Sequence, residues 1–205
     1  MTHGFAAALL PLLGHLMSLT ARAETSASGP AEIEKAELRR QFEAAAGKMR
    51  GPRSDEWQLA SYALASLADE LLIVDIPWEG QGWWENHAME VDLFGSRRRA
   101  TEFYSRAEKA ATLPIPDAIS VFVLAVLLGF RGILRESPDQ VEAWLRTNSR
   151  LVRGPEDLPL LPPRSAPPAG APPQQGPLKL LWQSVLGVIL GTILLVTAWW
   201  AFWLS

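Results

Sequence analysis

The sequence contains no cysteine, which excludes disulfides, thiol nucleophiles and cysteine-based zinc or iron–sulfur sites together. It also lacks a basic excess, because 19 Lys and Arg stand against 22 Asp and Glu, a net charge of -3. Proteins that follow the phosphates of a nucleic acid usually carry more positive than negative charge. We therefore expect no nucleic-acid partner.

Familiar catalytic signatures are missing as well. The sequence has no G-x-S-x-G, no G-x-x-x-x-G-K-[ST], no G-x-G-x-x-G and no H-E-x-x-H motif, and its three histidines lie far apart. Long alternations of apolar and polar β-branched residues, which are typical of strands, are also scarce. These absences disfavour an enzyme and predict an all-α protein.

The clearest positive signal is an uncharged run of 25 residues, from Leu180 to Leu204. At about 1.5 Å per residue, a helix of this length crosses a hydrocarbon layer of about 30 Å. Tryptophans, which favour membrane interfaces, lie near both of its ends. We predict a transmembrane anchor over residues 179–205, marked by Leu180, Trp182, Leu190, Leu195, Trp199, Trp200 and Trp203.

The charges beside this run predict its orientation in a membrane. Lys179 and Arg164 precede the run, and only Ser205 follows it. Lys and Arg gather on the cytoplasmic side of membrane spans. The sequence therefore predicts a single-pass protein whose amino-terminal part faces the cytoplasm.

A proline-rich segment, residues 154–178, precedes the predicted anchor. It has nine prolines between Gly154 and Pro177 and no amphipathic period. Proline-rich chain is semi-rigid and extends by about 3.1 Å per residue, so such a segment reaches up to about 70 Å. We interpret it as a spacer, with an SH3-type ligand as the alternative, which leaves residues 1–153 as the folded domain.

The amino terminus has two interpretations. Its apolar stretch and the following Ala21-Arg22-Ala23 imitate a signal peptide with a cleavage site, which would make this an exported, membrane-attached protein. However, no Lys or Arg precedes the stretch, and Pro11 and Gly14 interrupt it. We therefore predict that residues 5–20 form a first helix packed on the domain.

Helical periodicity continues through the rest of the domain. We place Lys35, Ser66 and Asp69 on outward polar faces and His87 on an apolar stripe, as a core histidine. The segment from Asp117 is apolar enough to be the central buried helix. The predicted helices cover about 31–49, 54–74, 84–94, 100–111, 117–134 and 138–148.

Two groups of residues were considered as chemical sites. Asp69 and Glu70 are adjacent on a helix and point about 100° apart, so they cannot face one substrate together. Glu85, His87 and Glu90 have a spacing that could hold a metal, but His87 is better explained as a core residue. We predict no metal site, no cofactor and no catalysis; a tail-anchored hydrolase that uses Glu70 and His87 is the alternative.

A series of short motifs resembles the DotU/IcmH (TssL-like) family, inner-membrane proteins of type VI and type IVB secretion systems. The likeness covers about residues 5–153 and is reinforced by the carboxyl-terminal run. The motifs are Asp69-Glu70-Leu71-Leu72, Pro77-Trp78 with Gly80, Trp83-Trp84, Leu93-Phe94-Gly95, Glu102-Phe103-Tyr104, Pro116, and Leu128-Gly129-Phe130-Arg131-Gly132 with Arg135.

This resemblance implies a cytoplasmic all-α domain of about six to eight helices, arranged as two small bundles in a hook-like shape and followed by one transmembrane helix. It implies a structural role in the inner membrane, with an IcmF-like membrane protein and baseplate components as partners, and a homodimer or higher oligomer. Together with the residue patterns, it predicts a structural joint or partner-binding site formed by Asp69, Glu70, Trp78, Trp84, Phe94, Gly95, Phe130 and Arg131.

Overall fold

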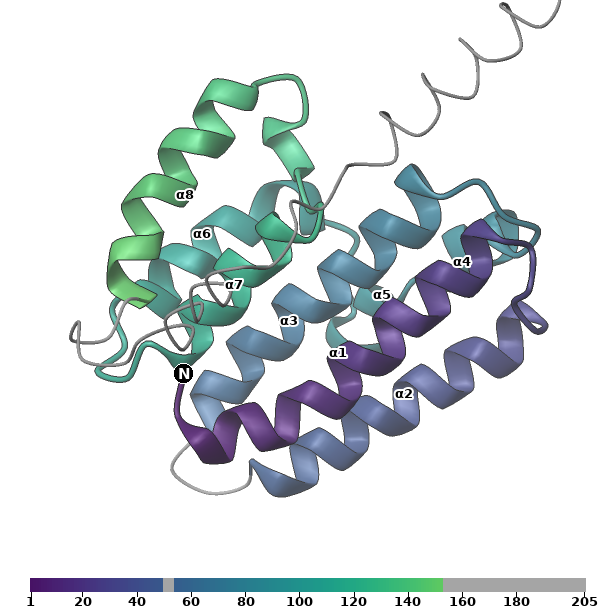
Figure 1. Cartoon of the computed structure of the whole chain (residues 1–205), viewed down its shortest axis with the longest axis horizontal. Coiled ribbons are helices and arrows are strands. Elements are labelled where there is room, and N and C mark those ends of the chain that lie inside the picture. Colours follow the sequence, from purple (N-terminus) through teal and green to yellow (C-terminus); the bar gives the residue numbers. More distant parts are fainter. Residues whose placement is uncertain (50–53, 153–205) are drawn as a thin grey trace, which may run out of the picture. The chain divides into compact units, whose positions relative to one another are not determined.

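The computed structural model of the chain describes residues 1–49 and 54–152, all of which belong to one compact unit. These residues form eight α-helices, one π-helical turn and one 3-10 turn, and they contain no strand (Figure 1). The elements are α1 (His3–Glu24), α2 (Ala31–Lys48), α3 (Ser54–Glu70), the π turn η1 (Leu71–Asp75), α4 (Gln81–Asn86), α5 (Met89–Phe94), α6 (Arg99–Ala111), α7 (Asp117–Leu127), the 3-10 turn η2 (Gly132–Leu134) and α8 (Pro138–Val152).

Helix α3 is the centre of the domain, because it packs against α5, α6 and α7. Its interior is rich in alanine, and small side chains let neighbouring helices approach closely. Helix α7 packs on α3 and also on α6 and α8, so it is apolar nearly all round, as expected of a buried helix. The predicted central helix is therefore confirmed, with α3 as its principal partner.

Helices α1 and α2 pair with each other on the other side of the domain. The α1 stripe Phe5, Leu9, Leu12, Leu16 and Leu19 is at most 1% exposed. This arrangement confirms a first helix packed on the domain, and α1 is longer at both ends than the predicted 5–20. Both α1 and the segment Asp117–Leu134 are long and apolar enough to cross a membrane by composition alone, yet both bury side chains inside the domain.

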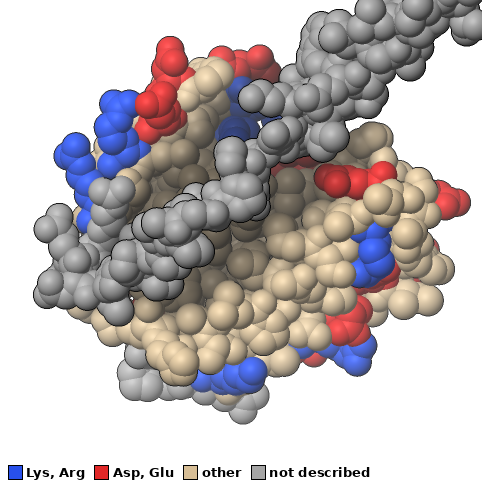
Figure 2. All heavy atoms as spheres, viewed as in Figure 1, with Lys and Arg blue, Asp and Glu red and all other residues tan. Residues whose placement is uncertain are grey.

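The start of α1 is tied to the start of α7. The main-chain N–H of Thr2 donates to Asp117 Oδ1 at 2.6 Å, and the Thr2 hydroxyl donates to Oδ2 of the same carboxylate. Asp117 is fully buried. In the part of the domain surface that Figure 2 leaves visible, most side chains are uncharged, and acidic and basic ones lie together toward the upper left and the right.

Two helix boundaries differ from the predictions. The helix from Asp117 ends at Leu127 instead of continuing to 134, because Gly129 and Gly132 adopt φ values of +127° and +52° and turn the chain. The single helix predicted over 84–94 is two helices, α4 and α5, separated at His87 and Ala88. The predicted segment 54–74 is helical, but its last turn is the π turn η1.

Several polar residues also lie elsewhere than predicted. Ser66 and Asp69 are fully buried instead of forming an outer stripe, and Lys35 is buried in an ion pair with Asp92 at 2.6 Å. His87 is exposed and stacks on Trp83, so it is not a core histidine. The predicted spacer 154–178 and anchor 179–205 lie outside the described residues.

Candidate functional site

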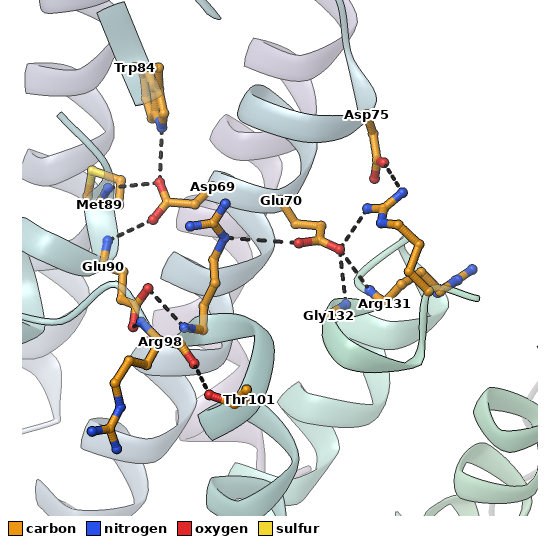
Figure 3. A network of polar contacts seen from close by, with 12 residues as sticks. Asp69, Glu70, Asp75, Trp84, Met89, Glu90, Arg98, Thr101, Arg131 and Gly132 are labelled. Carbon is orange, nitrogen blue, oxygen red and sulfur yellow. Dashed lines mark hydrogen bonds and ion pairs between the residues drawn. The ribbon is translucent and has the colours of Figure 1, made fainter. Parts of the chain in front are cut away.

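The candidate site begins at the last turn of α3, where Asp69 and Glu70 are 0% and 4% exposed. Figure 3 shows the two carboxylates pointing to different sides of the helix, as expected for adjacent helical residues. Asp69 faces the start of α5, and Glu70 faces the segment around η2. A third buried carboxylate, Glu90, lies beside them.

Asp69 binds the start of α5. Its Oδ1 accepts hydrogen bonds from the main-chain N–H of Met89 at 2.8 Å and from the indole N–H of Trp84 at 3.0 Å, while Oδ2 accepts from the N–H of Glu90 at 2.8 Å. Met89 and Glu90 are the first two residues of α5, and the first N–H groups of a helix have no partner within that helix. Asp69 therefore caps a helix that begins 20 residues later in the chain.

Glu90 repeats this arrangement at the next helix. Its two carboxylate oxygens accept from the N–H groups of Arg98 and Arg99 at 2.9 and 3.1 Å, and these residues are the cap and first residue of α6. The hydroxyl of Tyr62, from the middle of α3, also donates to Glu90 at 3.0 Å. Helices α3, α5 and α6 therefore meet at one buried carboxylate.

Glu70 holds the segment that follows α7. Its Oε1 accepts from the N–H of Gly132 at 3.0 Å and from Arg135 Nη2 at 2.7 Å, and its Oε2 lies 4.0 Å from Arg99 Nε. Gly132 has a φ of +52°, and a Cβ there would lie 2.8 Å from the carbonyl oxygen of Ala100. Only glycine fits this position without displacing its neighbours.

The electrostatics of the site follow from its burial. Burial raises the pKa of Asp69 above its usual range, while the three hydrogen bonds it accepts act in the opposite direction. Burial, with the Glu90 charge beside it, also raises the pKa of the Tyr62 hydroxyl. These carboxylates accept main-chain N–H groups, an arrangement that holds helices and offers no free base to a substrate. Among the described residues, no group of three His, Asp or Glu is arranged to bind a metal.

The turn between η1 and α4 is built by tryptophans. Trp84 is fully buried and hydrogen-bonded to Asp69, and the Trp78 ring meets it edge to face at 6.0 Å. The Trp78 indole N–H donates to the carbonyl oxygen of Leu72 in η1 at 2.9 Å. A Cβ at Gly80 would lie 2.4 Å from the Trp78 ring, so the chain passes there only because residue 80 is glycine.

The other predicted site residues lie at the end of α5 and in the segment that follows α7. Phe94 and Gly95 form the end of α5, where the Phe94 ring meets Tyr62 at 5.0 Å and Gly95 has a φ of +64°. Phe130 is buried and stacks on Phe103 at 3.8 Å, and the Arg131 side chain donates to the carbonyl oxygen of Val126 at 2.6 Å.

The role of Glu90 could not be predicted from the sequence. Its signal was weak, since nothing in the local sequence says that a carboxylate 21 residues after Asp69 points into the same cluster. The structure also does not support pairing Glu70 with His87. Glu70 contacts Arg99, Gly132 and Arg135, whereas His87 contacts the ring and carbonyl oxygen of Trp83.

A Trp78→Ala variant tests the tryptophan turn. Trp78 is half-buried, so we expect a loss of about 2 to 3 kcal/mol in the free energy of unfolding, somewhat below the cost for a fully buried aromatic. For a chain of this size, the melting temperature should fall by roughly 5 to 10 °C. Circular dichroism of the full chain in detergent micelles measures this change. The melting temperature of Trp78→Phe, which loses the indole N–H and one of the two rings but keeps an aromatic ring, should fall less. An unchanged melting temperature together with lost partner binding would instead make Trp78 a partner contact.

The fold and the site together define an all-α domain in which buried carboxylates accept the first N–H groups of helices. The family model described as "Type VI secretion system protein DotU" matches residues 5–204, nearly the whole chain. The chain therefore belongs to the DotU family, whose members are structural inner-membrane components of type VI secretion.

Among solved structures, the chain is similar to the "Cytoplasmic domain of TssL from Acinetobacter baumannii". The sequences are 20% identical, the match covers 70% of this chain and 96% of that chain, and the TM-score is 0.60. This likeness confirms the all-α fold. No curated protein matches the chain.

Proposed function

We propose that the chain is a docking subunit of the secretion apparatus, held in the inner membrane by one carboxyl-terminal helix and presenting its helical domain to the cytoplasm. The observation that carries this proposal is the family match, because it extends to residue 204 and so includes the uncharged run 180–204 as well as the domain. Lys179 and Arg164 support a cytoplasmic domain by their position before the run.

The partners we propose are an IcmF-like inner-membrane protein and baseplate components, bound by a dimer or higher oligomer of this chain. We propose that Asp69, Glu70 and Trp84 serve these contacts indirectly. Each is at most 4% exposed, so a partner cannot reach it without moving helices. These residues fix the positions of α4, α5 and η2, and the surfaces of those elements are then available for docking.

The proposal is tested in cells from which the gene has been deleted. The wild-type chain should restore release of a type VI secreted protein, and a large inner-membrane protein of the IcmF type should co-purify with it from detergent extracts. Protease added to intact spheroplasts should leave the domain uncut, and protease added after lysis should digest it. Cleavage in intact spheroplasts would place the domain outside the cytoplasm and contradict the proposal.

A further inference from the structure

A pocket of about 400 Å³ lies where the connection between α1 and α2 meets the turn before α4. It is separate from the carboxylate cluster and is open to solvent. Its lining residues come from two stretches of chain, Ser28, Gly29, Pro30, Ala31 and Glu32 on one side and Glu79, Gly80 and Trp83 on the other.

Two carboxylates line the pocket, Glu32 on one side and Glu79 on the other. Both side chains are exposed, and within residues 1–49 and 54–152 neither makes a hydrogen bond or an ion pair. Two neighbouring acids are already paired. Glu34 accepts from Arg22 at 2.5 Å, and Asp92 pairs with Lys35 at 2.6 Å.

The Trp83 ring adds an aromatic wall whose orientation is fixed. It stacks on the His87 imidazole, with centroids 4.1 Å apart and planes 13° apart. Lys35 Nζ lies 5.8 Å from the ring centroid, and its charge is balanced by Asp92. The part of the ring that lines the pocket offers apolar contact to an aliphatic stem, and the two carboxylates attract a cationic group at its end.

Other occupants fit this chemistry less well. An anion would be repelled by both carboxylates, and the positive end of the α2 dipole is already matched by Glu32 and Glu34 in its first turn. A metal ion usually needs three or more protein ligands, and no such group exists among the described residues.

We propose that this pocket receives a single arginine or lysine side chain from a protein partner. Glu32 and Glu79 bind its cationic group, and Trp83 contacts its aliphatic stem. The inference rests on the docking role proposed above and adds the chemistry of one contact. It assigns one basic contact to this end of the domain, where Figure 2 shows acidic side chains together with basic ones.

The pocket is tested with short peptides and the full chain in detergent micelles, labelled with ¹⁵N at the tryptophan indoles. The Trp83 signal is assigned by its absence in Trp83→Phe. A neutral-ended Gly-Gly-Arg-Gly-Gly peptide should shift this signal saturably at millimolar concentrations. The Glu32→Gln/Glu79→Gln variant should weaken binding at least about tenfold, because two charge-assisted contacts are lost.

The matched control is Glu108→Gln/Glu136→Gln, which removes the same charge from two exposed residues elsewhere on the domain. This variant should bind the arginine peptide within about twofold of the wild type, because distant exposed charges are screened by salt. Equal loss in both double variants, no saturable shift with the arginine peptide, or an equal shift with Gly-Gly-Glu-Gly-Gly would each overturn the inference.

A cellular experiment separates this inference from the proposed function. In the deletion strain, the wild-type chain and the control variant should restore secretion, while Glu32→Gln/Glu79→Gln should lower it at least about fivefold, with unchanged amounts of the chain in the membrane. If all three restore secretion equally, the pocket inference fails and the proposed function stands. If the wild-type chain itself does not restore secretion, the proposed function fails.

Discussion

Replacing Asp69 with alanine should destabilise the domain by about 3 to 5 kcal/mol, the usual cost of removing one partner from a buried polar cluster. The main-chain N–H groups of Met89 and Glu90 and the indole N–H of Trp84, all in fully buried residues, would lose their acceptor. The melting temperature of the full chain in detergent should fall by roughly 10 °C, measured by circular dichroism.

Two further variants make this result specific. Asp69→Asn keeps one acceptor oxygen and should cost less than alanine, because burial already disfavours the charged form. Asp55→Ala, an exposed acid in the first turn of the same helix, should cost less than about 1 kcal/mol. Asp69→Ala melting within a degree or two of the wild type would show that Asp69 is not a structural cap.

The second large effect is expected for Glu70→Ala, which should lower the free energy of unfolding by about 3 to 5 kcal/mol. The Gly132 N–H would lose its acceptor, and Arg99 and Arg135 would lose a carboxylate that is only 5% exposed. Arg135 should tolerate this better than Arg99, because Arg135 also pairs with Asp75 at 2.8 Å.

A double-mutant cycle separates the ion pair from the rest of the Glu70 contacts. Glu70→Ala, Arg135→Ala and the double variant are compared by thermal or denaturant unfolding of the full chain. Residues in direct contact usually show a coupling energy of about 0.5 to 3 kcal/mol, so the double variant should lose less than the sum of the single variants. Strict additivity would mean that Glu70 stabilises the domain without Arg135.

The sequence predicted those helices and side-chain directions that depend only on residues nearby in the chain. The helix predicted over 31–49 is α2, which buries Leu38, Phe42 and Ala45, and the helix predicted from residue 138 is α8, which begins at Pro138. The divergence of Asp69 and Glu70 also followed from helix geometry alone. These features need no knowledge of distant parts of the chain.

The remaining features depend on contacts far along the sequence. Asp69 looked like an outer polar residue because the periodicity of α3 cannot show that α5 places two N–H groups opposite it. The turn at Gly132, which follows α7, is held by Glu70 across 62 residues, and this contact could not be predicted from the local sequence. Lys35 was placed outside because its partner, Asp92, belongs to another helix.

The capping pattern has a consequence for how this end of the domain folds. Helices α4 and α5 have six residues each, and isolated helices of that length do not persist in water. Asp69 of α3 accepts a hydrogen bond from the first N–H group of α5. In the same way, Glu90 of α5 accepts one from the N–H of the residue that caps α6. We therefore expect α5 and α6 to form only once α3 is in place, and a local opening at Asp69 to release α5 and α6 together.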